Sequence, residues 1–250
     1  MPISPNQGST GGGTVVTITG SNLANASAVK FGSKNATITA NTPTSVTVIS
    51  PSGTGAVPVT VTTPGGTSNP LTFYYVGAPF KSGLSASSGP LAGGNTITIT
   101  GTGLSTASSV SFGGTTATPT VTSDSSISVT VPAGAAVGSV GVSVTTAGGT
   151  NNGLSYTYVG VPTVSGFAPT SGPASGGTAV TITGTNLDTT QSVTFGGIAA
   201  PFSVISSTTL SAVSPPTADG APGPADITVT NQAGSATAPT PFQYLAGPGI

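Results

Sequence analysis

The chain has 250 residues, of which only 3% are charged, against about 25% in an ordinary globular domain. Its three Lys, with no Arg and a net charge of −1, are too few for a surface that displaces counterions from nucleic-acid phosphates. The chain also lacks Cys, His and Glu. These absences exclude a disulfide framework and remove the usual general bases and nucleophiles of enzymes.

No apolar stretch approaches the roughly 18 residues that indicate a membrane span, so we expect no membrane insertion. The segment that starts at Met1 has neither the basic nor the apolar region of a secretory signal. The chain is then cytosolic, exported by another route, carried on a particle, or cut from a longer precursor. Among these we expect an extracellular, cell-surface or particle-associated location.

Along the chain, one pattern occurs three times. Two glycines precede an alternating apolar and Thr stretch that ends in a glycine, at Gly20, Gly101 and Gly184. Each copy continues with a Val-x-Phe-Gly stretch, then a Pro, then a loop of different length in each copy, and closes on a pair of aromatic residues. The repeats predict three domains, at residues 1–76, 77–159 and 160–250, the last with a C-terminal tail.

The strands expected within each copy alternate apolar and polar residues with a period of two, as at Val16 and Ile18 or at Val29 and Phe31. Such a pattern predicts strands buried on one face, and the Gly, Pro, Asn and Ser clusters between them predict turns. About seven short strands in roughly 80 residues are typical of an antiparallel β-sandwich. We therefore predict an all-β chain of three tandem immunoglobulin-like sandwiches, joined by short Pro-bearing linkers into a rod.

The segments Ser88–Gly101 and Ser171–Gly184, with the Phe-Gly ends and the final aromatic pairs, resemble IPT/TIG domains. The first copy departs mildly, with Gln7-Gly8-Ser9 where the others have Ser-Gly-Pro. The resemblance implies an early-set immunoglobulin-like fold, as in plexin-type receptors, dimerisation modules of some transcription factors and bacterial surface proteins. It also implies a module that spaces or binds and does not catalyse.

Candidate chemical sites are few. We expect no enzyme activity and no metal, nucleotide or redox cofactor, because the four acidic residues are separated Asp and no ligand-rich motif is present. A Lys–Asn crosslink at Lys30 or Lys34 lacks the carboxylic acid that normally promotes it. Asp219 and Asp226 lie close enough in sequence to meet around Ca²⁺, although solvated loop charges are the simpler interpretation.

Two aromatic residues break the repeat pattern. Phe80 lies in the first linker, and Phe202 follows the strand that ends at Phe195. Either is a candidate for stacking on a sugar or a partner, against the simpler interpretation of linker packing for Phe80 and core packing for Phe202.

The two ends of the chain are in phase with the linkers. When the repeats are aligned, Leu245–Ile250 matches the linker Val76–Lys81, with Pro248 at the position of Pro79. Met1 aligns with Ser82, the residue that follows this linker. A head-to-tail contact between copies is one explanation. The others are excision from a longer array and a gene that ends there by chance. The candidate assembly residues are Met1, Pro2, Ile3, Pro248, Gly249 and Ile250.

Three functions remain open at this point. The first is a structural or adhesive module, a spacer or fibre subunit whose partner is a protein, including a second copy. The second is a carbohydrate-binding accessory module of a larger enzyme or surface protein, with a surface polysaccharide as partner. The third, a dimerisation region of a DNA-binding factor, is the weakest because no basic partner domain is present.

Overall fold

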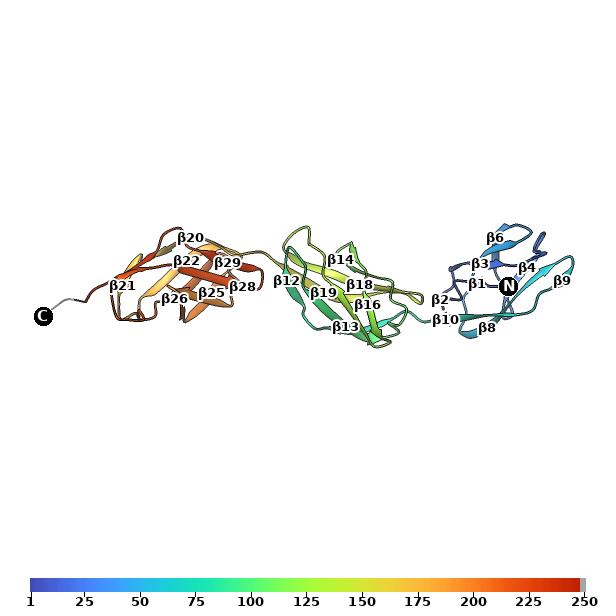
Figure 1. Cartoon of the computed structure of the whole chain (residues 1–250), viewed down its shortest axis with the longest axis horizontal. Helices are drawn as coiled ribbons and strands as arrows, with labels where there is room; N and C mark the ends of the chain where they lie inside the picture. The colour runs from blue at the N-terminus through green and yellow to red at the C-terminus, as the bar shows by residue number, and fades with distance from the viewer. Residues whose placement is uncertain (248–250) are drawn as a thin grey trace. The chain divides into compact units, whose positions relative to one another are not determined.

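The structure is a computed structural model that describes residues 1–247, and these form short strands without a helix (Figure 1). Residues 248–250, and with them the predicted assembly contacts Pro248, Gly249 and Ile250, lie outside the described part. Spatial contacts divide the chain into two compact units, and the division runs through the second repeat. Within residues 1–247 no helix is long and apolar enough to cross a membrane.

The first repeat, strands β1 to β10, forms two sheets that face one another across its core. The smaller sheet has the order β1 (Ile3–Ser4), β3 (Val15–Thr19), β7 (Ser45–Ile49), β6 (Thr37–Asn41). The larger has the order β2 (Gln7–Ser9), β10 (Leu71–Val76), β8 (Gly55–Thr63), β4 (Ala28–Phe31), β5 (Lys34–Asn35), with β9 (Gly66–Thr67) also paired to β8.

The second repeat has the same two sheets with the same strand order. One is β11 (Phe80–Leu84), β13 (Thr96–Thr102), β17 (Ser126–Thr130), β16 (Thr120–Ser123). The other is β12 (Ser88–Pro90), β19 (Gly149–Val159), β18 (Gly138–Thr146), β14 (Ser109–Phe112), β15 (Thr115–Ala117).

In the third repeat the second sheet is divided. The undivided sheet is β20 (Thr163–Ala168), β22 (Ala179–Thr185), β26 (Thr209–Val213), β25 (Phe202–Ser206). The other parts are β21 (Ser171–Pro173), β30 (Phe242–Leu245), β27 (Gly223–Ala225), and β24 (Ile198–Ala200), β23 (Ser192–Phe195), β28 (Ile227–Asn231), β29 (Gly234–Thr237). The division falls at Asp226, between β27 and β28, where the first two repeats have one continuous strand.

Each repeat contains its own core of alternate strand residues, as the period-two pattern predicts. In the first repeat Val16, Ile18, Val29 and Phe31 are buried. The residues between them on the same strands are outside the core, the half-buried Thr17 and the exposed Lys30. The core cluster of the first repeat contains no residue beyond Tyr75, and that of the third contains none before Ala174. The cores of the first and third repeats are therefore separate from one another. The predicted all-β, immunoglobulin-like class is confirmed.

The paired glycines of the repeated motif occupy a turn that few other residues adopt. Gly12 and Gly13 have φ of 80° and 82°, and the pairs at Gly93 and Gly176 are alike. A Cβ on Gly12 would lie 2.7 Å from the backbone carbon of Pro51. Glycine is therefore needed here for two reasons: the backbone is left-handed, and at Gly12 it lies close to the backbone of Pro51.

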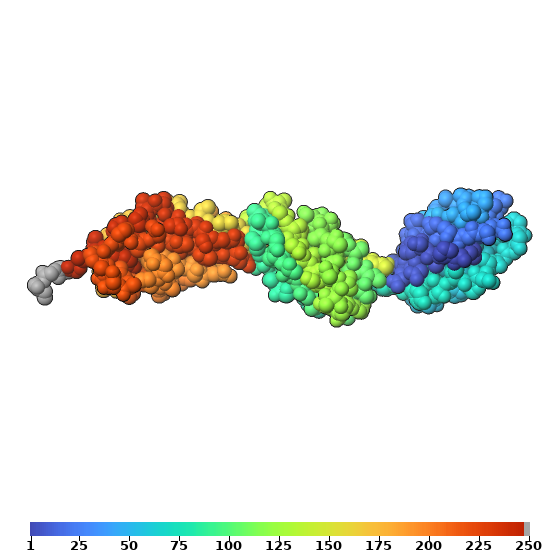
Figure 2. Space-filling model, viewed as in Figure 1, coloured from blue at the N-terminus to red at the C-terminus, as the bar shows by residue number. Residues whose placement is uncertain are grey.

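The loop that varies in length between copies lies between residues 50 and 54, 131 and 137, and 214 and 222. In each copy its second residue is the repeated proline, and it joins the two sheets at one end of the sandwich. In Figure 2 the three copies can be followed from blue to cyan, green to yellow, and orange to red. The loop is the principal difference between copies, and it borders one of the surface hollows described below.

Candidate functional site

The last tyrosine of every repeat ties the variable loop to the final strand. The hydroxyls of Tyr75, Tyr158 and Tyr244 donate to the carbonyl oxygens of the repeated prolines, at 2.7, 2.8 and 2.6 Å respectively. These acceptors are Pro51, Pro132 and Pro215. Burial raises the pKa of all three tyrosines above the ordinary value, so the hydroxyls stay protonated donors. The repeated Pro and the repeated Tyr of the sequence thus form the same hydrogen bond in each of the three repeats.

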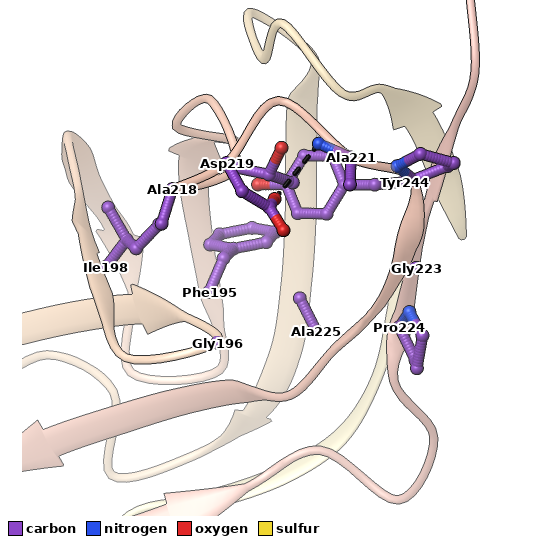
Figure 3. Close-up of a pocket in the computed structure, with 12 residues that line it drawn as sticks. Phe195, Gly196, Ile198, Ala218, Asp219, Ala221, Gly223, Pro224, Ala225 and Tyr244 are labelled. Atoms are coloured by element: carbon purple, nitrogen blue, oxygen red, sulfur yellow. Dashed lines mark hydrogen bonds between the residues drawn. The ribbon is translucent and has the colours of Figure 1, made fainter.

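Beside this tie the first and third repeats each have a hollow. The one in the third repeat has a volume of about 280 Å³, and the one in the first about 490 Å³. Both are bordered by the Phe-Gly end of a strand, the variable loop and the last tyrosine. The two hollows are therefore the same place in two copies, and Figure 3 shows the one in the third repeat.

The rims of these hollows carry single charges that are already engaged by the protein. In the first repeat the Lys34 Nζ donates to the Ser52 carbonyl oxygen at 2.8 Å and to its hydroxyl at 3.2 Å. In the third, the Asp219 carboxylate accepts from the Ala221 N–H at 3.0 Å (Figure 3). The one charged side chain at each rim is therefore already held by its own loop or by the neighbouring one.

The acidic residues do not gather into a metal site within residues 1–247, where no three of His, Cys, Asp and Glu lie together. Asp219 caps its own loop, and the backbone carbonyl of Asp226 accepts from the Gly196 N–H at 2.9 Å. Asp124 accepts from the N–H groups of Gly103 and Ser105 at 3.1 and 3.4 Å. These hydrogen bonds, with one from the Ser105 side chain as the largest cause, lower the pKa of Asp124.

Lys81 is the one charged residue whose side chain the described structure buries, with 7% of its surface exposed. It lies on β11 of one sheet, and its Nζ donates at 2.6 Å to the Val142 carbonyl oxygen on β18 of the other. Burial lowers the pKa of the amine. Lys81 therefore links the two sheets of the second repeat, a role that the sequence analysis did not assign to it.

A second kind of depression lies in the first repeat beside the β8–β9 turn, which Figure 1 shows at one end of that repeat. We call it the entry groove. It has a volume of about 340 Å³, and it is lined by Met1, Ser21, Asn22, Leu23, Val61, Thr63, Gly65, Gly66, Thr67 and Ser68. Its floor is apolar, because Leu23 and Val61 belong to the core, and its walls are hydroxyl groups and backbone.

The matching positions of the other two repeats hold the incoming linkers. In the second repeat Gly77 lies against Gly148, and the Asn151 amide donates to the Pro79 carbonyl oxygen. In the third repeat the carbonyl oxygens of the linker residues Gly160 and Val161 accept at 3.0 and 2.9 Å from side-chain amides. The donors are Asn231 and Asn186 respectively.

The aromatic residues singled out by sequence have different environments. The Phe80 side chain is 64% exposed at the start of β11. Phe202 is half-buried and packs against the core of the third repeat. The edge strand β25 that begins at Phe202 also exposes Ile205 to 64%, next to an irregularity in its pairing with β26.

The predicted assembly residues at the N-terminus lie along the first strand and beside the entry groove. Met1 lines the groove and is 42% exposed, Pro2 is exposed and accepts from the Thr19 N–H at 3.1 Å, and Ile3 packs against the core. The groove itself was missed, although the shared Gly-Gly-Thr turns at Gly65 and Gly148 were visible in the sequence. The structure was needed because groove walls come from segments far apart in the chain.

Comparison with known proteins identifies a family for each repeat. A family model of the IPT/TIG domain matches residues 1–75, 79–158 and 162–244. No curated protein matches the chain. A solved structure of the plexin A4 full extracellular region matches 100% of this chain at 22% identity with a TM-score of 0.52.

Other solved structures match less closely. One is a Bacteroides ovatus SGBP-B from a mixed-linkage glucan utilization locus, in complex with a heptasaccharide, at 17% identity and a TM-score of 0.32. It is matched over 96% of this chain and 65% of its own length. The chain spans about a quarter of the plexin chain, 24%. At these identities the plexin match supports the fold alone.

Proposed function

The chain belongs to the IPT/TIG domain family in all three of its repeats, and from this premise we propose that it is a non-enzymatic structural or adhesive module, a spacer or fibre subunit at a cell or particle surface. The observation that carries the proposal is how the repeats use their reactive groups. The hydroxyls of Tyr75, Tyr158 and Tyr244 hold loops, Lys81 links two sheets, and Asp124 caps a turn.

This use of reactive groups suits a load-bearing module. A catalytic group needs a pKa near the operating pH and access to substrate. Here burial raises the pKa of the three loop-holding tyrosines, and each hydroxyl is engaged with a backbone carbonyl. The same contact recurs in every copy, which is expected when a sandwich is repeated for its stability and length.

A domain exchange in the source cells tests the structural role. Residues 79–158 are replaced by a second copy of residues 162–244, so that the number of sandwiches and the linker at residues 159–161 are kept while the middle surface changes. We expect the amount of chain on intact cells, measured with antibody, and the adherence of the cells to be retained. Loss of adherence in an exchanged chain that still folds and reaches the surface would contradict a spacer role and indicate a specific site on the middle domain.

A second candidate function, binding of a surface polysaccharide, is favoured by one observation. Phe80 exposes an aromatic ring to solvent, and an exposed aromatic residue offers a flat apolar face for stacking. On a glycan array, a binder of this kind loses its signal on Phe80→Ala. The half-buried Phe202→Ala serves as the comparison, because its ring packs on the core. An array without any bound glycan eliminates this candidate.

A further inference from the structure

The linkers enter the second and third repeats as added strands at the edge of a sheet. In the second repeat Phe80 pairs with Thr102 and Lys81 with Gly101. In the third, Thr163 pairs with Thr185 and Val164 with Gly184. With these pairs, β13 and β22 continue two residues further than the equivalent strand β3 of the first repeat, which ends at Thr19.

The first repeat keeps the glycine that this pairing requires. A Cβ on Gly101 would collide with the Phe80 carbonyl oxygen, and one on Gly184 with that of Thr163. At Gly20 the nearest atoms are side-chain atoms of Met1, whose Cγ lies 2.6 Å from the Cβ position. The backbone beside Gly20 is therefore open to a strand once the exposed Met1 side chain moves aside.

We propose that the entry groove of the first repeat, with the β3 edge at Gly20, binds residues 246–250 of a second copy of this chain as an added strand. The proposal rests on the structural role above and adds a partner and a site to it. The occupant follows from the seated linkers: Ala246-Gly247-Pro248 has two small residues and a Pro, as Gly77-Ala78-Pro79 does, and Gly160-Val161-Pro162 has Gly, an aliphatic residue and Pro.

The side chains of this segment suit the positions that they would take. Gly249 would lie opposite Ser21, where Phe80 and Thr163 lie in the other repeats. Ile250 would lie opposite Gly20, in the position of Val164, which is half-buried against its domain's core. An apolar residue is favoured there because Leu23 and Val61 line the groove.

Such a contact joins one end of the chain to the other end of the next copy. A head-to-tail contact of this kind does not close on itself unless the geometry returns to the start, so it propagates into a filament. Strand addition at a sheet edge supplies main-chain hydrogen bonds, and the groove supplies selectivity for the side chains. With 3% charged residues, the surfaces carry little repulsion that would oppose the contact.

Two variants of the full chain separate the two halves of the contact. Gly20→Val blocks the groove, because its side chain takes the place of the incoming carbonyl. In the free chain the atoms nearest to its Cβ are side-chain atoms of Met1 and Leu23. Deletion of residues 246–250 removes the occupant and leaves the groove. Gly141→Val is the matched control, since Gly141 has open space around its Cβ position on an exposed strand residue.

Light scattering and electron microscopy over a concentration series give the result. We expect the wild-type chain and Gly141→Val to associate into open assemblies, and Gly20→Val and the deletion each to stay monomeric. Mixing the two monomeric variants should give one-to-one pairs and nothing larger, because one contributes only a groove and the other only a tail.

Three outcomes overturn the proposal: a wild-type chain that is monomeric up to its solubility limit, assemblies that persist in either variant, or a mixture that does not pair. If Ile205→Lys alone abolishes association, the interface is the exposed edge strand β25 and the proposal is wrong. None of these outcomes changes the domain-exchange result, so the structural role stands or fails separately.

Discussion

In every repeat a glycine of the short second strand faces the tip of an aromatic ring. A Cβ on Gly8 would lie 2.7 Å from the Phe73 Cζ, and one on Gly172 would lie 3.0 Å from the Phe242 Cζ. In the second repeat the ring is a tyrosine, and its hydroxyl meets the Cβ position of Gly89. In the first and third repeats the hydroxyls of Thr14 and Thr178 lie closer still. These glycines are required by the side chains packed against them, since none of the three has a positive φ.

The tyrosine of the second repeat comes with its own partner. The Tyr156 hydroxyl and the Asn95 amide are joined by contacts of 2.9 and 3.1 Å, where the first and third repeats pair Phe with Thr. We expect Tyr156→Phe to destabilise the second domain by about 1–3 kcal/mol, because it leaves a partly buried amide without this partner. Adding Asn95→Thr should recover most of the loss in a denaturant-unfolding cycle, and additive losses would contradict the coupling.

The phenylalanine at the end of the Val-x-Phe strand belongs to the core of its own repeat only. Phe31 contacts Phe73 edge-on with ring centroids 5.0 Å apart, and Phe195 contacts Phe242 at 5.3 Å. We expect Phe31→Ala to lower the free energy of unfolding of the first domain by about 3–5 kcal/mol and to leave the other two unchanged. Calorimetry should show one shifted transition, with the exposed Phe80→Ala as control. Equal shifts in all three transitions would show that the cores are not independent.

The loop-holding tyrosines give the protein a pH dependence at its alkaline limit. Burial raises their folded-state pKa above the unfolded value of about 10. Their contribution is therefore complete below pH 10 and is lost as pH rises through the folded pKa, because the unfolded chain releases the protons first. Tyr75→Phe should flatten the fall of the first domain's melting temperature above about pH 10. Tyr74→Phe, at an exposed neighbouring residue, should not.

At the scale of strands, the glycine that ends the repeated motif has different neighbours in the first and second repeats. At Gly101 an added side chain meets the carbonyl of the paired linker strand, whereas at Gly20 it meets a movable methionine. We expect Gly101→Val to destabilise the second domain by about 1–3 kcal/mol, as overpacking does, and Gly20→Val to leave the first domain's melting temperature nearly unchanged. Thermal unfolding of the two variants checks this, and equal losses would mean that the β3 edge is already occupied.

The edge strands show how the copies differ within a constant topology. The strands β6, β16 and β25 occupy the same edge of the same sheet, and all three show a register irregularity. Only β25 carries two successive exposed aliphatic residues, Val204 and Ile205. An apolar edge without a charge is prone to pair with other chains, which is why Ile205→Lys is included in the assembly test.

For the whole molecule, charge has little part in stability or association. Only seven side chains are charged, three Lys and four Asp. Four of them hydrogen-bond to backbone groups of their own domain: Lys34, Lys81, Asp124 and Asp219. Salt screens interactions between exposed charges and has little effect on apolar and backbone contacts. We expect the melting temperature and the association midpoint to change little between low and moderate salt. A strong salt dependence, measured by light scattering, would indicate an electrostatic interface that the strand-addition contact does not contain.

The amino-acid sequence by itself determined the class and the repetition of this fold. Period-two alternation at residues such as Val16, Ile18 and Val29 specifies which side chains are buried, because a strand places successive residues on opposite faces. The paired glycines, the repeated Pro and the final Tyr recur in each copy, so their structural importance was visible without coordinates. Their partnership as donor and acceptor was not, because they are more than twenty residues apart.

Only the tertiary structure decided which surfaces are free. It packs the half-buried Phe202 against a core and leaves Phe80 exposed, although both residues break the repeat pattern of the sequence. It also assembled the entry groove from Met1, Leu23 and the turn at Gly65, which no local pattern connects. The groove is formed by segments that are distant in sequence, and which of these segments lie side by side depends on the strand order and register of the sheets. Local sequence determines strands, whereas packing between distant strands determines where a partner can bind.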